Sequence, residues 1–126
     1  MDFDLTPDQT AALDGWRRLV SRDIVPMVKP YRNKAFSKEA ATEILSLTTA
    51  YGVGSGWVPE DGGGAGIDFL TSGLLFEELS RWSPDAAGLA WVVEGAALKI
   101  YQNASEELKA RYLPGLVSGK LIACSA

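Results

Sequence analysis

The sequence contains no histidine and a single cysteine, Cys124, and these two shortages remove several kinds of chemistry at once. Without histidine, no serine can be activated in the usual Ser–His arrangement. One cysteine cannot form an internal disulfide, and without histidine it leaves no zinc site of the usual ligand spacing. A chain without disulfides suits a reducing compartment, so we expect a cytoplasmic protein with no metal site.

The sequence also lacks an excess of positive charge and a long apolar run. Its 12 Lys and Arg residues against 16 Asp and Glu residues give a net charge of −4, so we expect no nucleic-acid partner. The most apolar segment, 86–100, is too short to span a bilayer and carries Glu94 and Lys99. Residues 1–5 are acidic and do not resemble a signal peptide. We therefore expect no membrane span.

What the sequence does have is a series of helix starts, each followed by apolar residues at helical spacing. Ser, Thr and Asp residues suited to cap a helix precede most of these segments. The predicted helices run from Thr6 to the prolines Pro26 and Pro30, from Ser37 to Ala50, from Asp68 to Trp82, over 86–102, and from Ser105 to Leu113. This pattern predicts an all-α fold, an up-and-down bundle of about five helices.

The fourth predicted helix, 86–102, is apolar nearly all round. A helix without a polar face is buried on most sides, so we expect it at the centre of the bundle, with Asn103 closing it in the left-handed conformation. Glu94 stands out within it. Buried without a partner, this carboxylate would have a raised pKa and could act as an acid or base. The interpretation we favour is that it reaches an edge of the bundle or pairs with Arg or Lys.

Seven glycines lie between Gly52 and Gly66, directly before the third predicted helix. Glycine adopts positive φ angles without a Cβ clash, so this density predicts an irregular, closely packed connection, with Gly52 stopping the helix before it. The simpler alternative is a helix cap followed by an ordinary surface loop. A phosphate-binding loop is not expected, because a dinucleotide fingerprint follows a strand and this segment follows a helix.

The last residues, 121–126, are apolar and read as a β-strand, although no second strand is predicted to pair with it. A helical bundle that ends in one unpaired strand suggests a piece of a longer protein. We therefore expect a helical domain over 1–120 and the start of a truncated β domain over 121–126.

The remaining polar residues form no catalytic constellation. Glu77 and Glu78 are adjacent, so on a helix they point about 100° apart and cannot share one bound atom; we expect solvated or capping groups, with Glu77 pairing with Arg81 one turn later. Cys124 in an apolar strand predicts an inert core thiol. These residues alone therefore give no self-contained catalytic site.

Four segments together resemble the N-terminal helical domain of the acyl-CoA dehydrogenase family. Each is weak alone, but their order and spacing match along the whole chain. They are Phe3-Asp4-Leu5-Thr6-Pro7-Asp8-Gln9, Val58-Pro59-Glu60-Asp61-Gly62-Gly63-Gly64-Ala65-Gly66, Glu77-Glu78-Leu79-Ser80-Arg81, and Ser105-Glu106-Glu107-Leu108-Lys109-Ala110-Arg111-Tyr112-Leu113-Pro114.

The resemblance implies a flavoenzyme that binds FAD and desaturates an acyl-CoA thioester, with electrons passing to a flavoprotein or to oxygen. It also implies a middle β-barrel domain and a C-terminal helical domain beyond this chain, and a homo-oligomer when the protein is full length. The family's catalytic base and most of its flavin site would lie in those missing domains.

In the family, one face of the helix after the Glu-Glu-Leu segment lines the acyl chain. The resemblance places three such positions at Ala87, Trp91 and Gly95, and Ser125 near the flavin ring. The alternation of small, large and small side chains suggests a cavity for a compact or ring-bearing acyl group; the alternative is that Trp91 is ordinary core. Two other functions stay open: the same fold in a flavin oxidase or monooxygenase, and a non-catalytic helical interaction module.

Overall fold

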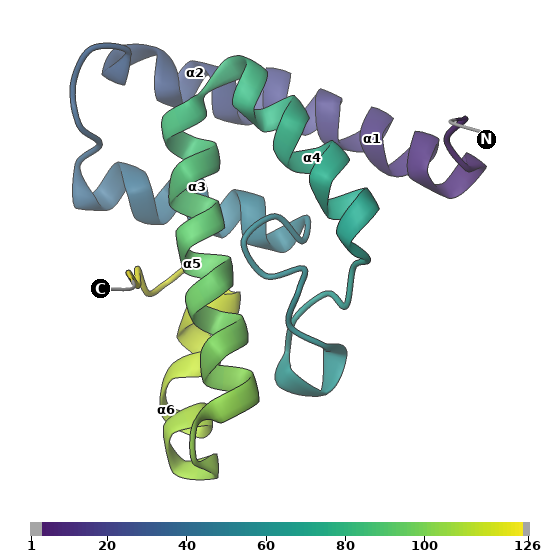
Figure 1. Ribbon diagram of the computed structural model, residues 1–126. Helices are drawn as coiled ribbons and strands as arrows, with labels where there is room; N and C mark the ends of the chain where they lie inside the picture. The colour runs from purple at the N-terminus through teal and green to yellow at the C-terminus, as the bar shows by residue number, and fades with distance from the viewer. Residues whose placement is uncertain (1–3, 125–126) are drawn as a thin grey trace.

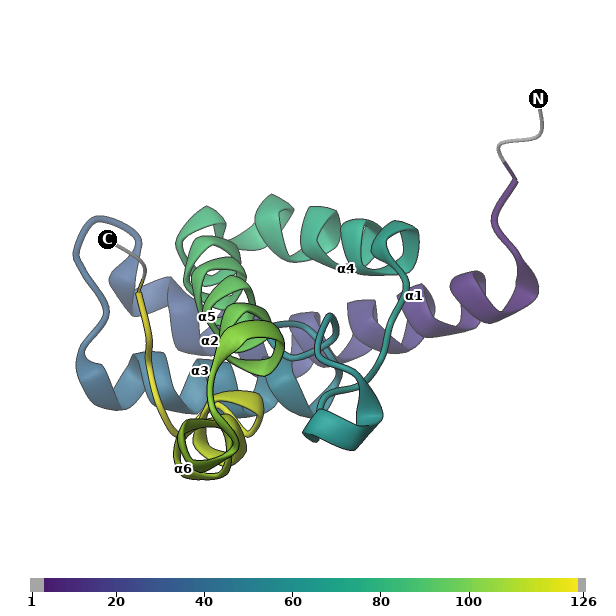
Figure 2. The ribbon, with the colours of Figure 1, turned by 60° about the horizontal axis from the view of Figure 1, so that its bottom comes forward.

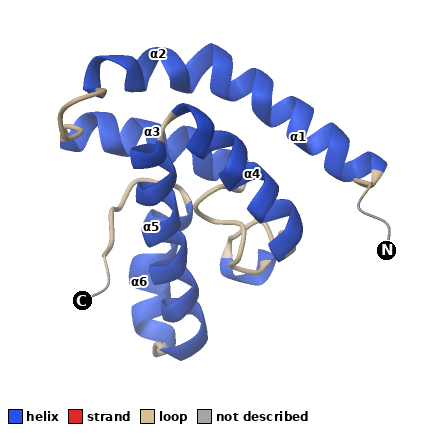
Figure 3. Cartoon of the chain, turned by 45° about the horizontal axis from the view of Figure 1, so that its top comes forward, coloured by secondary structure: helices blue, strands red, loops and turns tan. Residues whose placement is uncertain are grey.

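The computed structural model describes residues 4–124, and all regular structure in that range is helical (Figures 1 and 3). The elements are α1 (Pro7–Leu19), a π-helical turn (Val20–Ile24), α2 (Val25–Val28), a 3₁₀ turn (Lys29–Tyr31), α3 (Lys38–Ala50), a 3₁₀ turn (Glu60–Gly62), α4 (Phe69–Trp82), α5 (Pro84–Asn103) and α6 (Glu106–Val117). Helix α2 continues the course of α1, and α3 runs back along them, so the chain forms the helical bundle that the sequence predicts and the all-α class is confirmed (Figure 1).

The helix starts are set by side-chain caps, as the sequence predicts. Thr6 and Gln9 form a reciprocal capping box at α1. Ser37, Asp68 and Ser105 each accept the backbone N–H three residues later, at the starts of α3, α4 and α6. Each cap satisfies a backbone donor that a helix cannot satisfy itself, which is typically a contribution of about 1 kcal/mol.

The α-helix Val25–Val28 ends just before Pro30, as predicted, but Pro26 and Pro114 lie inside helices that we predicted to end there. Pro26 follows a π-helical turn, in which the register of the hydrogen bonds shifts, so the missing N–H and the bulky ring fit without a break. Pro30 lies in a 3₁₀ turn. Pro114 lies inside α6, which continues to Val117 because Leu113 and Leu116 on either side of the proline are both buried in the core. Tertiary packing therefore overrides the local preference of proline.

Helix α5 is central, since it packs against α3, α4 and α6. It is not buried all round: Ala90, Val93 and Ala97 face the core, whereas Trp91 is 53% exposed and Val92 is 40% exposed. The prediction that Asn103 closes this helix in the left-handed conformation is also wrong. Asn103 is the last helical residue, and the chain leaves through an extended Ala104.

The predicted C-terminal strand is not present in the described part of it. Residues 121–124 leave α6 without forming a strand and run past α3 (Figure 2). A β-ladder needs a second strand, and the described chain offers none. The domain boundary at 120/121 stays a prediction, with 125–126 outside the described residues. Gly119, at φ +71°, turns the chain back after α6.

Candidate functional site: an aromatic face on α4 and α5

The glycine loop, residues 52–66, is a packed structure and not a loose surface connection. Gly52 and Gly54 have φ angles of +93° and +102°, which only glycine adopts at low cost. The loop doubles back on itself through backbone hydrogen bonds from Ala65 to Ser55 and from Gly66 to Val58. The Val58 side chain is fully buried. The prediction of a closely packed connection is confirmed.

The amide groups of this loop point at Glu94 of α5. Oε1 of Glu94 accepts the N–H of Trp57 at 2.8 Å, and Oε2 accepts the N–H of Gly54 at 3.1 Å. Neither of these amides has a backbone acceptor among the described residues. Because the donors already bind a carboxylate of the chain itself, the loop is not a phosphate cradle, in agreement with the sequence interpretation.

Glu94 is fully buried, so our favoured interpretation, that it reaches an edge or pairs with a cation, is wrong. Burial raises its pKa above the ordinary value of 4.5, and the N–H groups of Trp57, Gly54 and Gly56 act in the opposite direction. Burial disfavours the charged form more than these N–H groups favour it, so the pKa of Glu94 is raised.

Four aromatic rings from the loop, α4 and α5 meet on one face of the molecule; we call this set (Trp57, Phe69, Phe76 and Trp91) the aromatic face. Trp57 makes T-shaped contacts with Trp91, with ring centroids 4.8 Å apart, and with Phe69 at 5.3 Å. Phe76 contacts Trp91 at 5.4 Å. Such T-shaped contacts are favourable because a positive ring edge meets a negative ring face.

The aromatic face is anchored inside and open outside. The indole N–H of Trp57 donates to the hydroxyl of Ser72, which is buried in α4, at 2.9 Å. Trp91 is about half exposed and Phe69 is 71% exposed. Large exposed aromatic groups that gather on one face mark a surface that contacts a ligand or another part of a protein.

Of the three positions that the resemblance assigns to the acyl chain, Ala87, Trp91 and Gly95, the structure places only some on the open surface. Trp91 belongs to the aromatic face, and Gly95, one turn later, has open space where a Cβ would stand. Ala87 lies in the core and is only 6% exposed. Ser125 lies outside the described residues. Sequence reasoning missed Phe69 and Phe76, although their i, i+7 spacing on one predicted helix face was a usable signal.

Two other expectations about side chains are wrong. Glu78 is neither solvated nor a cap; it is 8% exposed and binds Nε of Arg17 at 3.1 Å, so it joins α4 to α1. Cys124 is exposed and is not a core thiol, because no paired strand covers it. The predicted Glu77–Arg81 pair is present at 2.7 Å.

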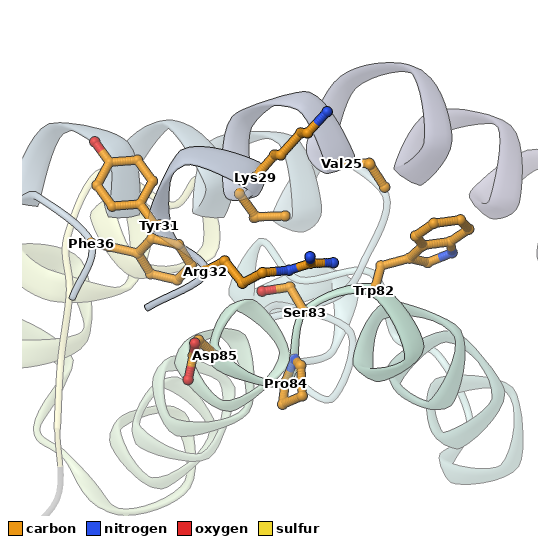
Figure 4. Close-up of a pocket in the computed structure, with 10 residues that line it drawn as sticks. Val25, Lys29, Tyr31, Arg32, Phe36, Trp82, Ser83, Pro84 and Asp85 are labelled. Carbon is orange, nitrogen blue, oxygen red and sulfur yellow. The ribbon is translucent and has the colours of Figure 1, made fainter. Parts of the chain in front are cut away.

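Two surface hollows lie away from the aromatic face. One, of about 370 Å³, lies between α2 and the α4–α5 turn, where Arg32 extends toward Trp82 (Figure 4). The other, of about 870 Å³, lies between the glycine loop and α6 and contains the hydrogen bond from Tyr101 to Asp61.

Within residues 4–124, no group of His, Cys, Asp and Glu residues could hold a metal ion. No helix in the described chain is long and apolar enough to cross a membrane.

Comparison with known proteins gives the same family as the sequence motifs. A probable acyl-CoA dehydrogenase of Bacillus subtilis is 34% identical over 85% of this chain and 18% of its own length. The L-prolyl-[peptidyl-carrier protein] dehydrogenase of a Serratia species is 30% identical over 100% of the chain and 33% of its own length. The structure of butyryl-CoA dehydrogenase from Megasphaera elsdenii superposes with a TM-score of 0.75, at 28% identity, over 97% of this chain and 32% of that one.

The chain thus spans about a third or less of the length of these relatives. The sequence model of the acyl-CoA dehydrogenase N-terminal domain matches residues 6–120, which is nearly the whole chain and covers every helix of the bundle. The chain is a member of the acyl-CoA dehydrogenase family and corresponds to its N-terminal helical domain.

Proposed function

We propose that this chain forms one wall of the acyl pocket in a full-length flavin-dependent acyl-CoA dehydrogenase, and that it supplies no catalytic residue. The observation that carries the proposal is the aromatic face. It includes Trp91, which lies on the helix that the family resemblance assigns to the acyl chain; Trp91 packs against Trp57 and Phe76, and its outer side is open. A thioester's hydrocarbon part would gain roughly 25 cal/mol for each Å² of apolar surface buried there.

The shape of this wall supports a compact or ring-bearing acyl group as the substrate. Trp91 projects from α5, while Gly95 leaves the space beside it empty. Ala87 is buried, so it would not contact the acyl group through an exposed surface; its small side chain would only leave room on this side of the helix. A bulky ring next to a gap fits a short or branched group, whereas a long straight chain would need the indole to move.

The flavin would be held mainly outside the described residues. Members of this family are flavoproteins, and we propose that the full-length protein binds FAD. The described chain offers no phosphate-binding loop for it, because the amides of Gly54 and Trp57 bind Glu94. Ser125, the one residue proposed near the flavin ring, lies outside the described range. We derive no step of the flavin chemistry from this chain.

The proposal includes the wider setting of the enzyme. A middle β domain and a C-terminal helical domain would follow this one, the full-length protein would be a homo-oligomer, and it would pass electrons to a flavoprotein or to oxygen. A cytoplasmic location would suit the single cysteine. An oxidase or monooxygenase on the same fold, or a non-catalytic interaction module, would share the helical domain, and the domains beyond residue 126 would distinguish them.

The test is the acyl preference of the full-length enzyme after Trp91→Ala. We expect kcat/KM for long straight acyl-CoA thioesters to rise relative to short or branched ones, because the indole no longer fills the pocket. Val92→Ala is the matched control, since Val92 is the next residue on α5 and is also exposed. An unchanged preference in the Trp91 variant, or an equal change in the control, would rule the proposal out.

A further inference from the structure

Glu94 has a role that an acyl-pocket wall does not by itself require. It is the only acidic residue on α5 after its first turn, it is fully buried, and it makes no ion pair among the described residues. Its partners are backbone amides of one short loop segment, 54–57. Because a buried charge is expensive, a residue that only filled space here would be replaced at a gain by an apolar one.

The carboxylate connects the loop to the aromatic face. Trp57 is held at both ends, with its backbone N–H bound to Glu94 of α5 and its indole N–H bound to Ser72 of α4. Trp91 lies one turn before Glu94 on the same helix and makes a T-shaped contact with the Trp57 ring. The position of the Trp57 ring against Trp91 therefore depends on the carboxylate one turn away.

The glycines of the segment give the carboxylate room to bind. A Cβ on Gly56 would lie 2.5 Å from the carbonyl oxygen of Gly52 and 3.1 Å from Oε1 of Glu94. A Cβ on Gly54 would meet the Thr49 side chain at 3.2 Å, and the φ of +102° at that position is strained for any other residue. The loop sequence and the carboxylate are thus matched to one another.

We propose that Glu94 is a positioning residue whose carboxylate clamps segment 54–57 onto α5, holds the Trp57 ring against Trp91, and thereby sets the acyl preference of the enzyme. This inference rests on the proposed function of the aromatic face. Glu94 does not touch the substrate; it acts through Trp57. Within the described residues Glu94 makes no ion pair, and its hydrogen-bond donors are backbone amides of this segment.

The first test is hydrogen–deuterium exchange of the full-length holoenzyme, read in peptides that cover 52–58. In the unaltered protein we expect the amides of Gly54 and Trp57 to exchange at least ~100-fold more slowly than in an unstructured chain, since they are bound to a buried acceptor. In Glu94→Gln we expect faster exchange in this segment, because an amide side chain presents only one acceptor oxygen to two donors. Peptides from α1 should be unchanged.

The second test is acyl preference, which a merely structural glutamate would not alter. Glu94→Ala should shift the kcat/KM ratio between straight and branched acyl-CoA thioesters in the same direction as Trp91→Ala, and Glu94→Gln should shift it less, because one acceptor is retained. Glu77→Gln is the matched control, being the same change at an exposed glutamate that binds Arg81.

The outcomes separate this inference from the proposed function. If Trp91→Ala changes the acyl preference and the Glu94 variants do not, the positioning role of Glu94 is wrong, but the proposal that this chain forms a wall of the acyl pocket is supported. If neither changes it, both are overturned. Unprotected amides at Gly54 and Trp57 in the unaltered protein would also overturn the clamp, and that measurement does not depend on any variant folding.

Discussion

The indole rings of Trp57 and Trp91 meet edge to face, with centroids 4.8 Å apart and planes at 82° to one another. One ring comes from the glycine loop and the other from the central helix, 34 positions later in the chain. The contact therefore ties the most irregular part of the fold to its most regular part. It also places two large rings on a face that the described chain leaves open.

This contact should contribute to stability beyond the area that it buries. A double-mutant cycle with Trp57→Leu and Trp91→Leu should give a coupling free energy of ~0.5–1 kcal/mol, at the low end for aromatic pairs because Trp91 is half exposed. The measurement is urea unfolding of the four proteins. A cycle between Trp57 and the distant Trp82 serves as the control and should give no coupling.

The ionisation of Glu94 should make stability depend on pH in an unusual direction for a carboxylate. Burial raises its pKa in the folded chain above 4.5, so between these two values the unfolded chain binds fewer protons than the folded one. Stability contributed by this group is therefore greatest below the unfolded pKa and is lost as pH rises through the folded pKa.

The comparison with Glu94→Gln isolates this effect, because the amide does not titrate. The free energy of unfolding of the unaltered chain, minus that of the variant, should fall as pH rises from about 4.5 and then level off. Urea unfolding of both proteins at a series of pH values measures the difference. A difference that is nearly constant above about pH 4.5 and falls as the pH is lowered below it would mean that the amide hydrogen bonds outweigh burial.

The Arg17–Glu78 pair should matter more than the other ion pairs of the described chain. The Glu78 side chain is 10% exposed, so Arg17→Ala leaves a largely buried carboxylate without its closest cation and should cost about 1–2 kcal/mol. Arg22→Ala breaks a pair with Asp23 in which the arginine is 76% exposed, and it should cost much less. Thermal unfolding of both variants measures the two losses of stability. Equal losses would show that the burial of Glu78 does not strengthen its ion pair.

Gly119→Ala should destabilise the bundle. At this position φ is +71°, and an added Cβ would lie 2.5 Å from the backbone carbon of Leu45, where α6 turns against α3. We expect a loss of at least ~1 kcal/mol from strain and steric conflict together. Gly73→Ala, at an open helical position in α4, is the control and should stabilise by up to ~1 kcal/mol. Chemical denaturation of the two variants checks the pair.

The helix starts and the fold class could be predicted because they depend on local chemistry. Ser37 and Asp68 cap their helices through side chains three residues from the amide they bind, and Gly52 stops α3 through its own φ angle. Helix ends were predicted less well. Pro26 remains within a helical segment because a π-helical turn shifts the hydrogen-bond register before it, and Pro114 because Leu113 and Leu116 on either side are buried; the local sequence reports neither.

The site could be predicted only in part for the same reason. Trp91 was found through the family motif, whereas the partners of Glu94 and Glu78 lie 37 and 61 residues away in sequence. A carboxylate in an apolar helix indicates burial, but its partner could be any cation or any set of amides. The strand expected over 121–126 needs a pairing partner, and residues 4–124 form no strand that could pair with it.

The most direct test of the account is photo-crosslinking of the full-length enzyme with an acyl-CoA thioester that carries a diazirine at the far end of its acyl group. Trypsin should release Trp91 in a peptide covering 82–99, between Arg81 and Lys99. We predict that this peptide is labelled and that excess unlabelled thioester suppresses the label. Labelling confined to residues beyond 126, with none in 82–99, would contradict the claim that this chain forms a wall of the acyl pocket.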